Sequence, residues 1–175
     1  MGLKQSNYSK WLRCAKAKSN SADNRKVDPK PALRPFRKIL VADDNPIIQR
    51  TLYFALRDKG YRVLIAENVA NALMIVRRES PELILLDINF TPDGGMEDGA
   101  TRDGFWAMDW MRRIDELQDI PVVMISSNEA DTFRPKALAA GAKAYFQKPL
   151  DKEVLVAAIG SLLAGKPFIN PKPAA

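Results

Sequence analysis

Charged and polar residues with catalytic potential follow four of the apolar runs in this sequence. Asp43 and Asp44 come directly after the run KILVA, and Asp87 is the last residue of the run LILLD. Ser126 follows PVVMI, and Lys148 follows AYFQ. Carboxylates, a hydroxyl group and an amine in these places could bind a cation and a phosphoryl group, provided that the fold brings them together.

A divalent cation is the simplest partner for the acidic residues. Three carboxylates repel one another in a small site unless a positive charge lies between them. The chain has no histidine and only one cysteine, so oxygen atoms are the ligands that it offers. Oxygen ligands favour Mg²⁺, with Mn²⁺ as an alternative. The sequence therefore predicts a magnesium site that includes Asp43, Asp44 and Asp87.

With a cation bound, one of these carboxylates could act as a nucleophile toward phosphorus, as aspartate does in enzymes that form an aspartyl phosphate. Asp87 is the best candidate because its strand is expected at the centre of the sheet, between the other contributors. The cation and Lys148 would neutralise the charge of the moving phosphoryl group. Ser126 would donate a hydrogen bond to one of the phosphoryl oxygens.

Five strand-like runs alternate with helical patterns and must position these residues. The runs cover 38–42, 62–66, 83–87, 121–125 and 144–147, and the helical patterns cover 46–58, 69–79, 104–117, 130–140 and 151–164. Such alternation is typical of βαβ units. We predict a doubly wound α/β fold of the flavodoxin-like kind, with a five-stranded parallel sheet in the order 2-1-3-4-5 and helices on both faces. Reactive groups gather at the carboxyl ends of the strands in this fold.

Helix starts are also visible in the sequence. Asn68 and Asp151 stand where side chains commonly cap the first turn of a helix. In 151–164, apolar residues recur with the period of an amphipathic helix, at Val154, Leu155, Ala158, Ile159 and Leu162.

Charge divides the chain into two parts. Residues 1–38 contain eleven Lys or Arg and two Asp, whereas 39–175 contain sixteen basic and nineteen acidic residues. We expect a basic, disordered extension over 1–36, an ordered domain over 37–165 and a short tail over 166–175. No run approaches the ~20 apolar residues of a membrane span, and no secretory signal is evident, which together predict a cytoplasmic protein without a membrane span.

The stretch 37–165 resembles the receiver domain of two-component response regulators. The segments ILVADDN, LILLD, PVVMIS and AGAKAYFQKPL carry the resemblance, in the same order and with similar spacing. They extend over about three-quarters of the chain. A sequence with all of these features is identified as a member of the family, and the resemblance adds roles for individual residues.

By this resemblance, Asp43 and Asp44 bind Mg²⁺, and Asp87 is both a metal ligand and the phosphoryl acceptor. Asn89 offers its backbone carbonyl to the cation. Ser126 is the hydroxyl that moves toward the phosphoryl group, and Lys148 is the cation that binds it.

The resemblance also implies a conformational switch. Tyr145 matches the aromatic switch position, and Lys148–Pro149 matches a peptide bond that is usually cis in the family. Phosphorylation of Asp87 would draw Ser126 inward, and Tyr145 would rotate into the space beneath helix 130–140. The surface of that helix, strand 144–147 and helix 151–164 would then change shape.

These features together predict a phosphorylation-dependent signalling switch that assists its own phosphorylation and dephosphorylation without being a dedicated enzyme. The resemblance implies a histidine kinase or His-phosphotransfer protein as the donor. Only GKPFINPKPAA follows 151–164, so we expect a stand-alone receiver that signals through a protein partner or a phosphorylation-dependent homodimer.

Two other functions remain open at this stage. A phosphohydrolase that forms an aspartyl phosphate is the first, although such enzymes generally carry D-x-D after the first strand. The second is a nucleic-acid-binding module that uses the basic residues of 1–38, which could equally contact an acidic surface.

The step from Asp87 to Asp103–Gly104 is also longer than is usual in the family. It indicates an acidic, glycine-rich insertion over 90–102, which is either a solvated loop or a lid.

Overall fold

The structure is a computed structural model that describes residues 36–90, 104–114 and 117–169. They belong to one compact unit, Pro35–Ala175. The predicted disordered extension over 1–36 lies outside the described residues, apart from Phe36. Most of the predicted insertion over 90–102 lies outside them as well, as do the last six residues of the chain.

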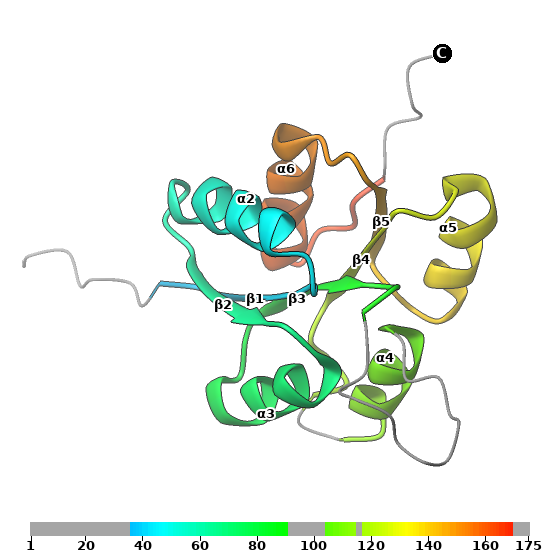
Figure 1. The fold of residues 1–175 in the computed structure, drawn as a ribbon, viewed down its shortest axis with the longest axis horizontal. Helices are drawn as coiled ribbons and strands as arrows, with labels where there is room; N and C mark the ends of the chain where they lie inside the picture. The colour runs from blue at the N-terminus through cyan, green and yellow to red at the C-terminus, as the bar shows by residue number, and fades with distance from the viewer. Residues whose placement is uncertain (1–35, 91–103, 115–116, 170–175) are drawn as a thin grey trace, which may run out of the picture. The chain divides into compact units, whose positions relative to one another are not determined.

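The strands form one parallel sheet in the order β2-β1-β3-β4-β5, which confirms the predicted topology (Figure 1). Their bounds are β1 (Lys38–Ala42), β2 (Arg62–Ala66), β3 (Leu83–Asp87), β4 (Val122–Ser126) and β5 (Ala144–Gln147). Only β4 differs from the prediction, by one residue at each end.

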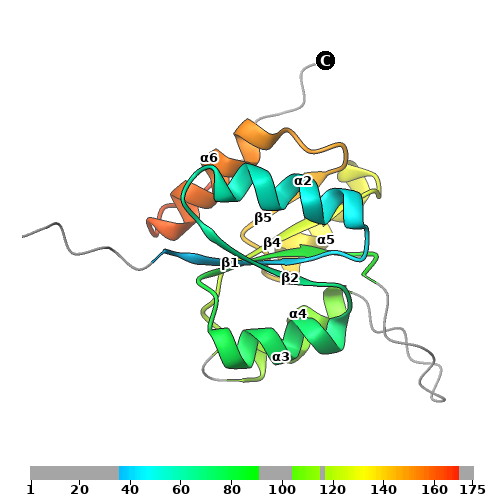
Figure 2. The same cartoon turned by 60° about the vertical axis from the view of Figure 1, so that its left-hand side comes forward.

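Helices cover both faces of the sheet. They are α2 (Pro46–Arg57), α3 (Val69–Glu79), α4 (Gly104–Arg112), α5 (Ala130–Ala139) and α6 (Lys152–Leu163). Buried residues of α2 and α6 pack on one face of the sheet, and those of α3, α4 and α5 pack on the other. Figure 2 shows α2 and α6 above the sheet and α3 and α4 below it. None of the described helices is both long and apolar enough to cross a bilayer.

The strand sequences explain this layered arrangement. Successive side chains of a strand point to opposite faces, so a strand covered on both sides is apolar throughout. In β1, Ile39 and Val41 face the α2 and α6 side, whereas Leu40 and Ala42 face the opposite side. All four are fully buried. A charged residue at the end of such a strand therefore lies at the edge of the packed core.

Two predicted helix caps are confirmed. Asn68 accepts a hydrogen bond from the backbone N–H of Asn71 at 2.7 Å. Asp151 accepts from the N–H groups of Glu153 and Val154 at 3.0 and 3.1 Å, so α6 begins one residue later than predicted. These bonds satisfy N–H groups that have no partner within the helix.

The predicted length of the helix over 104–117 is wrong, because α4 ends at Arg112. The N–H groups of Arg113 and Ile114 bond to the carbonyls of Trp110 and Met111, three residues back. This tighter pattern is typical of the last turn of a helix and does not propagate far. The apolar period continues to Leu117, which is why the sequence suggested a longer helix.

Candidate functional site

Three acidic residues meet at the carboxyl ends of β1 and β3. Asp43 and Asp44 follow β1, and Asp87 ends β3, its neighbour in the sheet. Each offers one carboxylate oxygen, and these oxygens all lie within 4.8 Å of one another. Asp43 and Asp87 are buried, and Asp44 is exposed. The structure thus brings together the three carboxylates that the sequence singled out.

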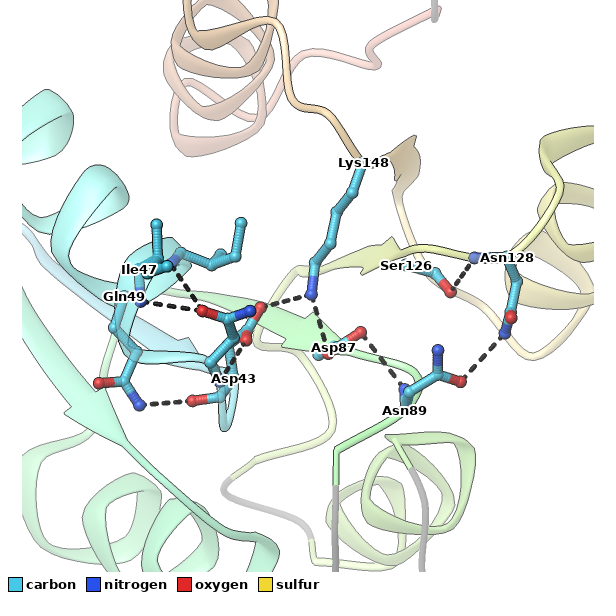
Figure 3. Close-up of polar contacts among 10 residues, drawn as sticks. Asp43, Ile47, Gln49, Asp87, Asn89, Ser126, Asn128 and Lys148 are labelled. Atoms are coloured by element: carbon cyan, nitrogen blue, oxygen red, sulfur yellow. Dashed lines mark hydrogen bonds and ion pairs between the residues drawn. The ribbon is translucent and has the colours of Figure 1, made fainter.

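Lys148 reaches the same place from the end of β5. Its Nζ lies 2.8 Å from Asp43 Oδ2 and 2.9 Å from Asp87 Oδ2, and Figure 3 shows the side chain between the two carboxylates. The Lys148–Pro149 peptide bond that follows is cis, as the resemblance implied. The Lys148 ammonium therefore contacts two buried carboxylates, one that follows β1 and one at the end of β3.

The segment after β1 fixes the position of Asp43. The N–H of Asn45 donates to Asp43 Oδ1 at 2.9 Å, and the Asn45 side chain accepts from the N–H of Ile47 at 2.9 Å. Pro46 fills the first turn of α2, where a missing N–H costs nothing. Gln49 donates to the backbone carbonyl of Asp43. Asn45 and Pro46 thus start α2, and Asn45 also fixes the position of the Asp43 carboxylate.

Burial and neighbouring charges both shift the pKa values of Asp43 and Lys148. Burial raises the pKa of Asp43 above 3.8, and the negative charge of Asp87 adds to this. The Lys148 ammonium and the Asn45 N–H oppose the rise without cancelling it. Burial lowers the pKa of Lys148, but the Asp43 and Asp87 carboxylates outweigh burial and raise it above 10.5. Lys148 is therefore charged at neutral pH, whereas burial disfavours the charged form of Asp43.

The donor set suits a hard divalent cation. Asp43 Oδ2 is buried, and its contact with the Lys148 ammonium lacks the direction of a hydrogen bond. Asp43 and Asp87 both contact the Lys148 ammonium, and Asp44 adds a third carboxylate oxygen within 4.8 Å of theirs. Asn89 lies beside them, because its N–H donates to Asp87 Oδ1 at 3.3 Å. The role of its carbonyl stays a prediction.

A chain of hydrogen bonds leads from Asp87 to Tyr145. Asn128 donates through its side chain to Asn89 Oδ1 at 3.0 Å and through its N–H to Ser126 Oγ at 3.0 Å (Figure 3). Its backbone carbonyl accepts from the Tyr145 hydroxyl at 2.8 Å. Asn128 therefore forms hydrogen bonds with Asn89, which follows the predicted acceptor Asp87, and with both predicted switch residues, Ser126 and Tyr145.

Tyr145 is fully buried, and burial raises its pKa above 10.0. A hydrogen bond with Ser126 and the charge of Arg134 lower it less, and the charge of Asp87 raises it further. Subtracting the tyrosinate absorbance titration of Tyr145→Phe from that of the wild-type chain isolates the titration of Tyr145. We expect this difference curve to have its midpoint above pH 10. Circular dichroism at each pH would confirm that the chain stays folded. A midpoint at or below 10 would contradict the burial of this hydroxyl.

Gly104 allows α4 to begin against the backbone of the acceptor strand. Its N–H donates to the Ile88 carbonyl at 3.1 Å, and a Cβ at this position would lie 2.3 Å from the Asp87 carbonyl oxygen. No side chain can fit there without moving the strand that carries Asp87. The Asp103–Gly104 pair was visible in the sequence, but this contact was not.

We expect Gly104→Ala to lower the free energy of unfolding by about 2 kcal/mol, the typical cost of inserting atoms into a packed region. Gly160→Ala in α6 is the matched control, because nothing lies within 4 Å of its added Cβ. That helical substitution should raise stability by about 0.5–1 kcal/mol. Urea unfolding measures both, and equal stabilities of the two variants would show that the close approach to Asp87 is absent.

Sequence reasoning missed two contributors to this site. Gln49 supports Asp43 from the first turns of α2, and nothing in its sequence context marks it. Asn128 is the second, and it links Asn89, Ser126 and Tyr145. Two of its three hydrogen bonds join it to residues far away in the sequence, Asn89 and Tyr145, so only the folded structure reveals them.

Comparison with known proteins identifies the relatives of this chain. Residues 39–160 match the response regulator receiver domain family. Protein PilH of Pseudomonas aeruginosa is 31% identical over 128 residues, which make up 73% of this chain and 98% of that protein. Transcriptional regulatory protein YxdJ of Bacillus subtilis is 27% identical over 126 residues, or 72% of this chain and 50% of that protein. The chain thus spans about half the length of the second relative.

Solved structures show the same fold. A response regulator receiver domain protein from Methanospirillum hungatei, described as CheY-like, has a TM-score of 0.63 and 25% identity, and the match covers 74% of this chain and 95% of that one. Chemotaxis protein CheY4 of Vibrio cholerae has a TM-score of 0.61 and 22% identity, with 71% and 97% covered.

Proposed function

This chain belongs to the response regulator receiver domain family of two-component signalling, and from that premise we propose that it is a switch driven by phosphorylation of Asp87. The observation that carries the proposal is the placement of Lys148 Nζ within 2.9 Å of both Asp43 and Asp87. A charged amine, a buried acceptor and two more carboxylates make an arrangement suited to phosphoryl transfer.

Mg²⁺ would be held by Asp43, Asp44, Asp87 and the backbone carbonyl of Asn89. When bound, Mg²⁺ supplies positive charge that offsets the charge of a phosphoryl group. The family resemblance supports this choice of metal, as does an all-oxygen donor set among the described residues. Mn²⁺ has the same preference for oxygen and would substitute.

The reaction transfers a phosphoryl group from a phospho-histidine of another protein to a carboxylate oxygen of Asp87. The bond from phosphorus to nitrogen breaks, its electron pair returns to the imidazole, and a bond from phosphorus to the Asp87 oxygen forms. Lys148 already contacts Asp87 Oδ2 at 2.9 Å and would bind the transferred group through charge. Ser126 is fully buried beside it, and its hydroxyl would donate to a phosphoryl oxygen.

The signal would leave through Asn128. When Ser126 turns toward a phosphoryl group, the Asn128 N–H must find another partner, and the Tyr145 hydroxyl is bonded to the carbonyl of the same residue. The chemistry at Asp87 would thereby bias the position of Tyr145 and the surface of α5, β5 and α6. A protein partner or a second copy of the chain would read that surface.

The experiment that tests this function is incubation with acetyl phosphate and Mg²⁺. A receiver gives close to one phosphoryl group per chain, with slow release of phosphate. The competing phosphohydrolase would give many turnovers and little labelled protein. The family membership and the position of the acceptor at the end of β3 both favour the receiver.

A further inference from the structure

The segment after α6 folds back and passes beside β5 (Figure 1). Gly165 makes the turn with φ of +70°, a conformation that favours glycine, and the N–H of Lys166 bonds to the Ser161 carbonyl at 2.9 Å. Phe168 then stacks on Phe146 of β5, with ring centroids 6.0 Å apart and an interplanar angle of 23°. These contacts seat the segment 165–169 next to the edge of the sheet.

This segment encloses a cavity together with α5 and β5. The cavity has a volume of about 340 Å³, near the lower end of the roughly 300–1,000 Å³ of ligand pockets. Its main lining residues are Arg134, Leu138, Lys143, Tyr145, Phe168 and Ile169. Phe168 and Ile169 lie beyond residues 39–160, so this wall is outside the part of the chain that matches the family.

The lining combines apolar surface with positive charge. Leu138 is 46% exposed and Ile169 is 88% exposed, which is costly for side chains of this size. Arg134 and Lys143 supply two cations, and no carboxylate is among the described residues that line the cavity. Arg134 Nε is buried and forms no hydrogen bond with the rest of the described chain. A buried donor without an acceptor is unfavourable, and an acceptor supplied from outside would remove the penalty.

We propose that this cavity binds a segment of a partner protein that presents a carboxylate next to a large apolar side chain. The carboxylate would pair with Arg134 and Lys143, and the apolar group would contact Leu138, Phe168 and Ile169. Charge complementarity selects this occupant, because an apolar segment without an acid leaves Arg134 Nε unpaired and a basic segment is repelled.

Tyr145 connects the cavity with the phosphorylation site. It lines the cavity, and its hydroxyl is bonded to Asn128. The use of the cavity as a signal output therefore rests on the proposed function. Binding itself can be measured on the unphosphorylated chain, so failure of the cavity to bind and failure of Asp87 to accept a phosphoryl group are separate results.

The test uses N-acetyl-phenylalanine, which carries a carboxylate and an aromatic ring, and its amide, which lacks the charge. Titration of the full chain is followed by NMR of backbone amides and of Leu and Ile methyl groups. We expect saturable shifts at Leu138 and Ile169, with binding of the acid at least severalfold tighter than binding of the amide. Equal binding of the two compounds, or shifts that avoid these residues, would overturn the proposal.

Two variants separate charge from packing. Arg134→Gln should remove the preference for the acid over the amide, whereas Phe168→Ala should weaken binding of both. Arg50→Gln on α2 is the matched control, because it removes the same charge from an exposed position outside the cavity and should keep the preference. Loss of the preference in Arg50→Gln would show that net charge selects the acid, and its retention in Arg134→Gln would show that Arg134 does not bind the carboxylate.

Discussion

Lys148→Ala should lower the free energy of unfolding by about 3 kcal/mol in the absence of divalent cations. The Asp43 side chain is 0% exposed and the Asp87 side chain is 4% exposed, and both carboxylates lie within 2.9 Å of the ammonium that this change removes. Removing one partner from a buried ion pair typically costs about 3–5 kcal/mol, because the remaining charge is left uncompensated. Urea unfolding with a chelator present measures the effect.

Two further variants show where the loss of stability in Lys148→Ala comes from. Lys152→Ala removes an exposed lysine nearby and should change stability by less than about 0.5 kcal/mol. Adding Asp43→Asn to Lys148→Ala should recover part of the loss, since one unpaired charge disappears with it. If Lys148→Ala costs no more than Lys152→Ala, then the ammonium does not compensate the acidic cluster.

Asp43→Asn should abolish stabilisation of the chain by Mg²⁺. At a Mg²⁺ concentration one hundred times Kd, a single site raises the free energy of unfolding by about 3 kcal/mol in the wild-type chain. The variant keeps the shape of the side chain and an oxygen that can accept from the Asn45 N–H, but it loses a charged ligand. Without Mg²⁺ it should be at least as stable as the wild type, because burial raises the pKa of Asp43 and makes its charge unfavourable, and because the Lys148 ammonium keeps Asp87 as a charged partner.

Thermal unfolding over a Mg²⁺ series provides the measurement. Asp58→Asn is the control, because Asp58 is exposed at the end of α2 and should leave the Mg²⁺ effect intact. An unchanged Mg²⁺ effect in Asp43→Asn would contradict the assignment of this carboxylate as a ligand.

The topology of the fold could be predicted because its signals are local and repeated. Each strand of the sheet is an apolar run covered on both faces, and each connection is long enough for a helix. The parallel order then follows from packing rules that hold across doubly wound proteins. The end of α4 could not be predicted, because the apolar period at Ile114 and Leu117 continues past the last helical turn.

The acidic cluster could be predicted because strand ends determine its geometry. Once the order of the strands is known, Asp43, Asp44, Asp87 and Lys148 have to meet, and the structure places them together. The hydrogen bonds of Asn128 could not be predicted, since they join loops whose conformation no local pattern specifies. The seat of Phe168 beside β5 was missed for a similar reason, because the tail has no period that indicates packing.

The most direct test of phosphorylation at Asp87 is the intact mass of the wild-type chain and of Asp87→Ala after incubation with acetyl phosphate, with and without Mg²⁺. We expect one added phosphoryl group on the wild-type chain with Mg²⁺, little without it, and none on Asp87→Ala under either condition. A phosphoryl group on Asp87→Ala, or labelling of the wild type that is indifferent to Mg²⁺, would contradict the account.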